Sequence, residues 1–165
     1  MTSYNQLKQY FAHIVEQSQD INDYTGYFAR ELHSKQGSYD GVTYPCLSLF
    51  GYSIGIEGEE LNSVAVRSMN FGILIGNVPA DDYEAQYQAI DQAETIAWKV
   101  IARLRYDHND KTHFLYNALL KNSIEVRPIE LEGVGLFGVE VAFKLKNRQS
   151  LKLDPNDWKD VEKIC

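Results

Sequence analysis

The sequence has 165 residues, of which 44% are hydrophobic and 24% are charged, the mixture of an ordinary globular domain. This length predicts one domain, and the composition excludes collagen-like, low-complexity and wholly disordered chains. Lys and Arg number 16 against 23 Asp and Glu, a net charge of -7. Such a charge repels a phosphate backbone and disfavours direct binding of nucleic acid.

Cysteine usage and the amino-terminal sequence bear on the compartment. The cysteines are Cys46 and Cys165, a pair that is not the disulfide framework of a secreted protein and favours a reducing compartment. The first ten residues lack a basic segment followed by an apolar one, and no apolar run is long enough to span a membrane. We therefore predict a cytoplasmic protein that is neither exported by that route nor membrane-spanning.

An amphipathic helix is predicted over residues 1–20, because apolar side chains recur there at spacings of three and four. Ser3 followed by Gln6 is typical of a capping box at its start. The apolar stripe consists of Leu7, Tyr10, Phe11, Ile14 and Val15. Residues 36–41 are rich in glycine and polar side chains and are predicted to form a loop.

Two strands are predicted next. Apolar and aromatic residues predict a strand over 46–52, and the polar, glycine-bearing residues 55–60 predict the hairpin loop that follows it. Residues 64–76 then alternate between two faces, and Arg67 interrupts the apolar one, which carries Ala65, Met69, Phe71, Ile73 and Ile75. A strand of this length reaches past an ordinary sheet toward a neighbouring molecule.

A long helix is predicted after Asp81 and Asp82, because carboxylates stabilise the amino terminus of a helix. Core packing is the expected role of Trp98. The apolar stripe consists of Tyr83, Tyr87, Ile90, Ala93, Ala97, Trp98, Val100, Ile101 and Leu104. Residues 107–111 form a polar break, and the apolar residues within 114–120 predict a short third helix after it.

A second hairpin closes the domain. Residues 123–129 alternate, and Pro128 favours an edge strand or a bulge. A turn at 133–135 leads into residues 136–146, which show the cleanest alternation in the chain. Its inward residues are Val139, Val141, Phe143 and Leu145, and its outward residues are Glu140, Lys144 and Lys146.

These elements predict an α+β fold for residues 1–148, in the order α-β-β-α-α-β-β, with residues 149–165 as a tail. Hairpins give antiparallel pairs. The expected architecture is a single-layer antiparallel sheet of about four strands with helices packed on one face. The other face of such a sheet meets water or a partner.

No constellation of residues indicates a chemistry. His108 and His113 lie near Asp107 and Asp110, but their spacing in a polar loop does not match that of helix-borne metal ligands. The glycines after Phe50 lack the dinucleotide-binding order, and no serine or cysteine has the context of an activated nucleophile. The sequence therefore predicts a protein that is not an enzyme, with no catalytic residue, no cofactor and no metal.

Contacts with other molecules are expected at the predicted hairpin instead. Glu57, Glu59 and Glu60 form an acidic loop tip, which is either solvated or docks on a basic partner surface. Tyr52 is one of 11 tyrosines, a residue type favoured at interfaces, and Arg67 is the charge within the apolar face. These five residues are the candidate partner or oligomer contacts.

The order of the predicted helices and strands resembles that of a known protein family. A starting helix, a hairpin with long strands, a long helix after Asp81-Asp82 and a closing hairpin (Ile124-Glu-Val-Arg-Pro-Ile-Glu, then Leu136-Phe-Gly-Val-Glu-Val-Ala-Phe-Lys-Leu) resemble the tail-terminator and tail-completion proteins of long-tailed bacteriophages. The resemblance covers residues 4–148 and lies in topology, not in a motif. It implies a non-enzymatic virion assembly protein of a phage or prophage.

Such a protein forms a homo-oligomeric ring on the end of the tail tube, stops its growth and offers a surface to the head connector. The implied partners are copies of itself and other virion proteins, without sequence-specific nucleic-acid binding and without a membrane. A net negative charge suits the lining of a channel through which DNA slides.

The leading alternative is a small α+β ligand-binding or enzymatic domain. Its pocket would lie between the long helix and the sheet and would use Tyr83, Tyr87 and Glu57. A third hypothesis is an adaptor that binds only other proteins.

Overall fold

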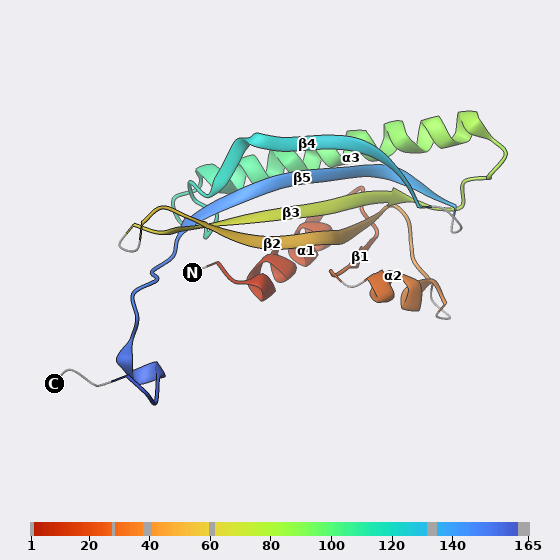
Figure 1. The fold of residues 1–165 in the computed structure, drawn as a ribbon. Helices are drawn as coiled ribbons and strands as arrows, with labels where there is room; N and C mark the ends of the chain where they lie inside the picture. Colours follow the sequence, from red (N-terminus) through yellow and green to blue (C-terminus); the bar gives the residue numbers. More distant parts are fainter. Residues whose placement is uncertain (1, 28, 38–40, 60–61, 132–134, 162–165) are drawn as a thin grey trace.

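A computed structural model describes residues 2–27, 29–37, 41–59, 62–131 and 135–161. The chain forms an α+β fold around a five-stranded mixed sheet with the strand order β1-β2-β3-β5-β4 (Figure 1). The strand β1 pairs with β2 in parallel, and the other neighbours are antiparallel. The strands are β1 (Asp23–Thr25), β2 (Cys46–Glu57), β3 (Val64–Ile75), β4 (Leu119–Leu131) and β5 (Leu136–Arg148). The predicted α+β class is confirmed. The sheet is mixed and not purely antiparallel as predicted, because β1 adds a fifth, parallel strand to the four expected.

Two helices, α1 (Tyr4–Gln17) and α3 (Tyr83–Asn109), lie along one face of the sheet, which we call the inner face (Figure 1). Ser3 caps α1 and Asp82 caps α3, and each side chain accepts a hydrogen bond from a backbone N–H of the first turn, at 3.1 and 2.9 Å. Both predicted helix starts are confirmed.

The main core lies between the inner face and these two helices. The alternation predicted for β3 and β5 is confirmed, because the register pairs Met69 with Phe143 and Phe71 with Val141, and all four side chains are buried. Small residues on α3, among them Ala93 and Ala97, let this helix approach the sheet closely. The core also includes Leu7, Phe11, Ile14, Leu47, Leu49, Ile73, Ile96, Val100, Leu104, Val139 and Leu145.

The segment between α1 and β2 differs from the prediction, which contained neither β1 nor α2 (Ala29–Gln36). Leu32 of α2 packs with Leu74 and Leu136, whose side chains leave the opposite, outer face of the sheet. This contact makes a second, smaller core. Helices therefore cover parts of both faces, and the prediction of helices on one face is wrong. Of the loop predicted at 36–41, residues 38–40 lie outside the described residues.

The helix predicted within 114–120 is absent from the described residues, where turns lead directly into β4. Asn117 adopts a left-handed backbone conformation, with a φ of 53°. Its N–H donates to the carbonyl oxygen of His108 at 3.0 Å. The predicted polar break also begins too early, because α3 continues through Asp107 and His108, which are both buried.

The first hairpin is longer than predicted. The strand β2 continues to Glu57, so residues 55–57 belong to the strand and not to the loop. Gly58 has a φ of 88° at the start of the turn, a conformation that side chains disfavour. Residues 60 and 61 lie outside the described residues, as do 133 and 134 of the second predicted turn. A register shift between Leu49 and Tyr52 marks a bulge in β2.

The chain leaves the body after β5. Residues 149–161, which we call the arm, project from the sheet and include a short 3-10 helix, η1 (Pro155–Asp157) (Figure 1). At its base the backbone N–H of Gln149 donates to the carbonyl oxygen of Ser63 at 3.1 Å. None of the helices in the described ranges combines the length and the apolar character needed to cross a bilayer.

Candidate functional site

The predicted contact residues divide into two groups. Glu57 and Glu59 are exposed at the β2–β3 turn, and the Nζ atom of Lys146 donates to Glu57 Oε2 at 3.2 Å. Glu60 lies outside the described residues. Tyr52 and Arg67 lie on the inner face, because Tyr52 pairs with Met69 and Arg67 pairs with Leu145. The structure therefore brings two of the five residues together and leaves two others at the tip.

Arg67 is a buried cation, only 4% exposed. Its Nε atom donates to the Tyr52 hydroxyl at 3.2 Å, and its Nη1 atom donates to Asn147 Oδ1 at 2.5 Å. Asn147 in turn donates to the Thr2 hydroxyl. In the described part of the chain these partners are neutral, and none is a carboxylate. The prediction that Arg67 lies within the apolar face is confirmed. Its guanidinium, however, is covered by residues of the same chain and is not exposed to a partner.

Three tyrosine rings lie beside this arginine. Tyr4 stacks on Tyr27 with ring centroids 4.4 Å apart, and both rings meet Tyr52 edge-on, at 4.8 and 5.7 Å. The Tyr27 hydroxyl is buried and has no hydrogen-bond partner among the described residues. Burial raises the pKa of Tyr27, so this hydroxyl stays neutral. The cluster closes the end of the main core around the amino end of α1.

Beyond this cluster the inner face of β2 is bare. Ile54 and Ile56 are 53% and 56% exposed, and their side chains lie on the inner face because they pair with Arg67 and Ala65. Among the described residues β1 pairs only with the first three residues of β2. The edge of β2 that points away from β3 therefore has no strand partner from Leu49 to Glu57. The predicted strand ended at Tyr52 and the predicted loop began at residue 55, although Tyr52, Ile54 and Ile56 alternate with smaller or polar residues.

The opposite edge of the sheet is formed by β4 and is protected. It carries Pro128, which cannot donate a backbone hydrogen bond, and the exposed Lys121 and Arg127. A register shift between Leu120 and Glu125 adds a bulge. Proline, cations and bulges are the devices by which natural sheets avoid pairing with other chains. The prediction that Pro128 marks an edge strand is therefore confirmed, and the two edges differ in character.

The outward side of α3 is aromatic, which corrects the predicted stripe. Tyr83, Tyr87 and Trp98 were expected to face the core, but they are 71%, 67% and 52% exposed. Tyr106 is 71% exposed, and the Trp98 indole donates to Glu94 Oε1 at 3.2 Å. The buried stripe of α3 uses Ala89 and Ile96 instead. Aromatic side chains in such positions are typical of protein interfaces.

A buried polar group joins α1 to the end of α3. Asp107 Oδ2 accepts a hydrogen bond from the Tyr10 hydroxyl at 2.7 Å and another from Arg103 Nε at 2.8 Å. Burial and the hydrogen bond to Asp107 raise the pKa of Tyr10. His108 Nδ1 accepts from the backbone N–H of Leu119 at 3.1 Å, and burial lowers the pKa of this imidazole. These contacts fix the two helices and the start of β4.

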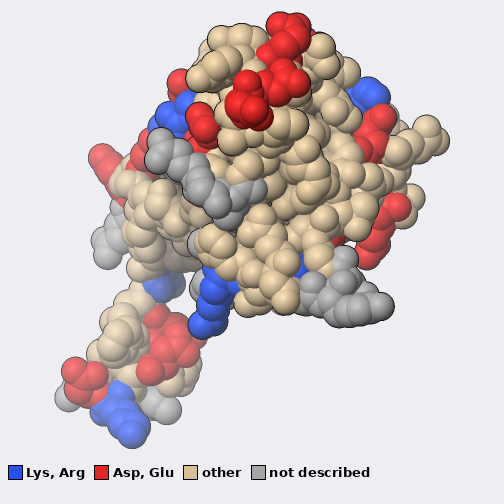
Figure 2. All heavy atoms as spheres, turned by 90° about the vertical axis from the view of Figure 1, so that its right-hand side faces the viewer, with Lys and Arg blue, Asp and Glu red and all other residues tan. Residues whose placement is uncertain are grey.

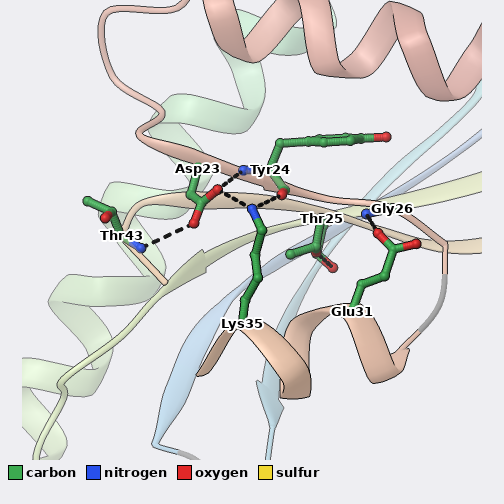
Figure 3. A network of polar contacts seen from close by, with 8 residues as sticks. Asp23, Tyr24, Thr25, Gly26, Glu31, Lys35 and Thr43 are labelled. Carbon is green, nitrogen blue, oxygen red and sulfur yellow. Dashed lines mark hydrogen bonds and ion pairs between the residues drawn. The ribbon is translucent and has the colours of Figure 1, made fainter. Parts of the chain in front are cut away.

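A second polar network holds α2 to β1 (Figure 3). Asp23 Oδ1 accepts from Lys35 Nζ at 2.6 Å and from the Tyr24 N–H at 2.7 Å, and Lys35 also donates to the Tyr24 carbonyl. Glu31 Oε2 accepts from the Gly26 N–H at 2.8 Å. Burial acts to raise the pKa of Asp23, but the hydrogen bonds from Lys35 and Tyr24 outweigh it and hold the pKa below its ordinary value.

The residues of the enzymatic alternative do not meet. Glu57 lies at the β2–β3 turn, at the opposite end of the sheet from the start of α3, and Tyr83 and Tyr87 face solvent (Figure 1). A groove of about 290 Å³ between α1 and α3 is crossed by the ion pair of Lys99 and Asp20, 2.8 Å apart. Within the described residues no group of three or more His, Cys, Asp and Glu side chains is placed to hold a metal ion.

Acidic side chains gather on the end of the molecule where α3 begins (Figure 2). Figure 2 views the end where α3 begins and shows Asp and Glu side chains gathered at the top, with Lys and Arg at the margins. Asp81, Asp82 and Glu84 belong to the start of α3. An acidic surface of this kind repels phosphate groups.

Comparison with known proteins adds no relative, because neither a protein-family profile nor a curated protein matches the sequence.

Proposed function

We propose that this protein is a non-enzymatic assembly protein of a phage or prophage, which binds copies of itself to form a ring at the end of a tail tube. One observation carries the proposal: large apolar side chains are exposed on two separate surfaces, the edge of β2 and the outward side of α3. A ring needs at least two different contact surfaces, because every copy contacts a neighbour on each side.

Other features support the same function. The order of long elements resembles that of tail-terminator proteins, and the net charge of -7 suits a channel through which DNA passes without binding. Tyr10, Asp23 and His108, whose pKa values are shifted, are engaged in contacts between helices and strands or between two helices. On this proposal the protein works in the cytoplasm of the host during assembly, joins the tail to the head connector and stays in the virion.

The proposal is tested by light scattering coupled to size-exclusion chromatography over a wide concentration range, followed by electron microscopy of the eluted species. We expect a closed oligomer with a central opening. A chain that stays monomeric at every concentration and gains thermal stability from a metabolite would contradict the proposal and favour the ligand-binding alternative.

A matched pair of variants tests the α3 surface. Trp98→Ser removes an exposed aromatic side chain, and Gln88→Ser changes an exposed polar residue of the same helix. Buried tryptophans are frequent hot spots of interfaces, so Trp98→Ser should raise the dissociation constant by about tenfold or more, and Gln88→Ser should leave it unchanged. Equal effects of the two substitutions would exclude this side of α3 from the interface.

A further inference from the structure

We propose that the arm (residues 149–161) of one copy adds as a strand to the free edge of β2 in a second copy and so joins the copies head to tail. This inference rests on the proposed function, because it presupposes self-association. It goes further by naming the two segments that make the contact.

The edge of β2 is suited to a partner strand. From Ser53 to Glu57 all residues are exposed, and the edge carries neither a proline nor a lysine. Ile54 and Ile56 are two large apolar side chains on the same side of this edge. The bulge in β2 lies before Ser53, and a stretch of edge without protection is a template for pairing with another chain. Since β4 at the other edge is protected, an occupant is expected at β2.

The arm is suited to supply that strand. Leu151 and Leu153 are 43% and 51% exposed, and Trp158 also faces solvent. Figures 1 and 2 both show the arm standing away from the body. The backbone is extended at Asp154, with a φ of -97° and a ψ of 114°. Among the described residues, Leu151 and Leu153 make no backbone hydrogen bond, and only the Ser150 side chain contacts the Lys152 N–H, so these groups can form the ladder of hydrogen bonds that strand addition requires.

The two segments match in pattern and charge. Side chains alternate along a strand, so Leu151 and Leu153 share one side and Lys152 takes the other. When the leucines lie against Ile54 and Ile56, Lys152 lies on the outer face, which is the face of Glu57. Glu57 is 61% exposed and can accept a second cation beside Lys146. In this arrangement the leucines contact the isoleucines, and Lys152 lies on the same face as Glu57.

The length of the arm favours a contact between copies over a contact within one chain. Arg148 pairs with Val64, which pairs with Glu57, so a strand added outside β2 lies three strand spacings from Arg148, about 14 Å. Leu151 follows Arg148 by three residues, and the chain between them spans at most about 11 Å. Leu151 therefore cannot reach the edge of its own β2, whereas the edge of a neighbouring copy imposes no such limit.

A complementation experiment in the full-length chain tests the inference. The arm variant Leu151→Glu/Leu153→Glu keeps an intact β2 edge, and the edge variant Ile54→Glu/Ile56→Glu keeps an intact arm. Far-UV circular dichroism verifies that both fold. Each alone should associate at least about tenfold more weakly than the wild type, because charges replace side chains that the contact buries. Mixed together, they should form one-to-one heterodimers, because one intact arm meets one intact edge.

The control is Ser53→Asn, an uncharged change at an exposed residue on the outer side of the same strand, which should leave association unchanged. If the wild type associates but the arm and edge variants associate equally well, the inference is overturned and the proposed function stands. Weak association of the two variants without complementation on mixing also overturns the inference. A wild-type chain that remains monomeric overturns the inference and the proposed function together.

Discussion

The register of β3 and β5 determines which side chains support the fold, and Phe143→Ala tests it. The Phe143 side chain is 2% exposed and pairs across the sheet with Met69. Its ring centroid lies 6.1 Å from those of Phe11 and Phe71. Truncating a core phenylalanine costs about 3–5 kcal/mol, and two aromatic contacts place this residue in the upper part of that range, at about 4–5 kcal/mol.

The measurement is urea unfolding followed by far-UV circular dichroism, together with the melting temperature. A domain of this size loses about 2–4 °C of Tm per kcal/mol, so Phe143→Ala should melt about 8–20 °C below the wild type. Lys144→Ala is the matched control, because this neighbouring side chain is exposed on the outer face, and it should change stability by less than about 0.5 kcal/mol. All chains are compared at one protein concentration, since association stabilises a fold by mass action. Equal losses would refute the register.

Three further predictions concern the polar and thiol groups. The lowered pKa of Asp23 means that its stabilisation is complete above the ordinary carboxyl pKa of about 3.9 and is lost as the pH falls through the lower folded value. Asp23→Asn should therefore cost about 1 kcal/mol at neutral pH in urea unfolding, and this difference should vanish in strong acid. Tyr10→Phe leaves Asp107 without one donor and should cost about 1.5–3 kcal/mol by the same assay, against no change for the exposed Tyr106→Phe. Burial raises the pKa of the Cys46 thiol to about 12, so iodoacetamide at mildly alkaline pH should alkylate it in a Cys165→Ser chain only after unfolding, as mass spectrometry will show.

The long elements could be predicted because their signals are local. The helix α1 and the strands β3 and β5 repeat their apolar positions often enough for the period to be read from the sequence. The caps at Ser3 and Asp82 gave the correct helix starts for the same reason, since a cap involves residues three apart.

The short elements could not be predicted, because distant contacts hold them. The strand β1 has three residues, too few to show alternation, and it is fixed by pairing with β2 and by the contact of Asp23 with Lys35. The helix α2 is placed by Leu32, whose partners Leu74 and Leu136 lie far along the chain. The helix predicted within 114–120 is replaced by turns, in which apolar residues are buried instead. Asn117 has a left-handed backbone conformation, which interrupts a helix at this point.

The candidate site was only partly predictable, because a sequence pattern does not say which segment covers a given face. Arg67 was located correctly on an apolar face, but its burial depends on Tyr52 and on Asn147, which is 80 residues away. Trp98 was assigned to the core on hydrophobicity, yet the alanines of α3 leave little room between this helix and the sheet, and the indole lies outside.

Arg67 also explains why the apolar part of β2 remains bare. A buried guanidinium needs polar partners, so an apolar helix could not cover the inner face at Arg67 without leaving that charge unsatisfied. The chain satisfies it with Tyr52 and Asn147, and the main core ends there. The strands continue past this point to Glu57 and Arg148, so Ile54 and Ile56 extend beyond the cover of α1. The same row of residues that ends the core thus creates the surface on which we propose that a second copy binds.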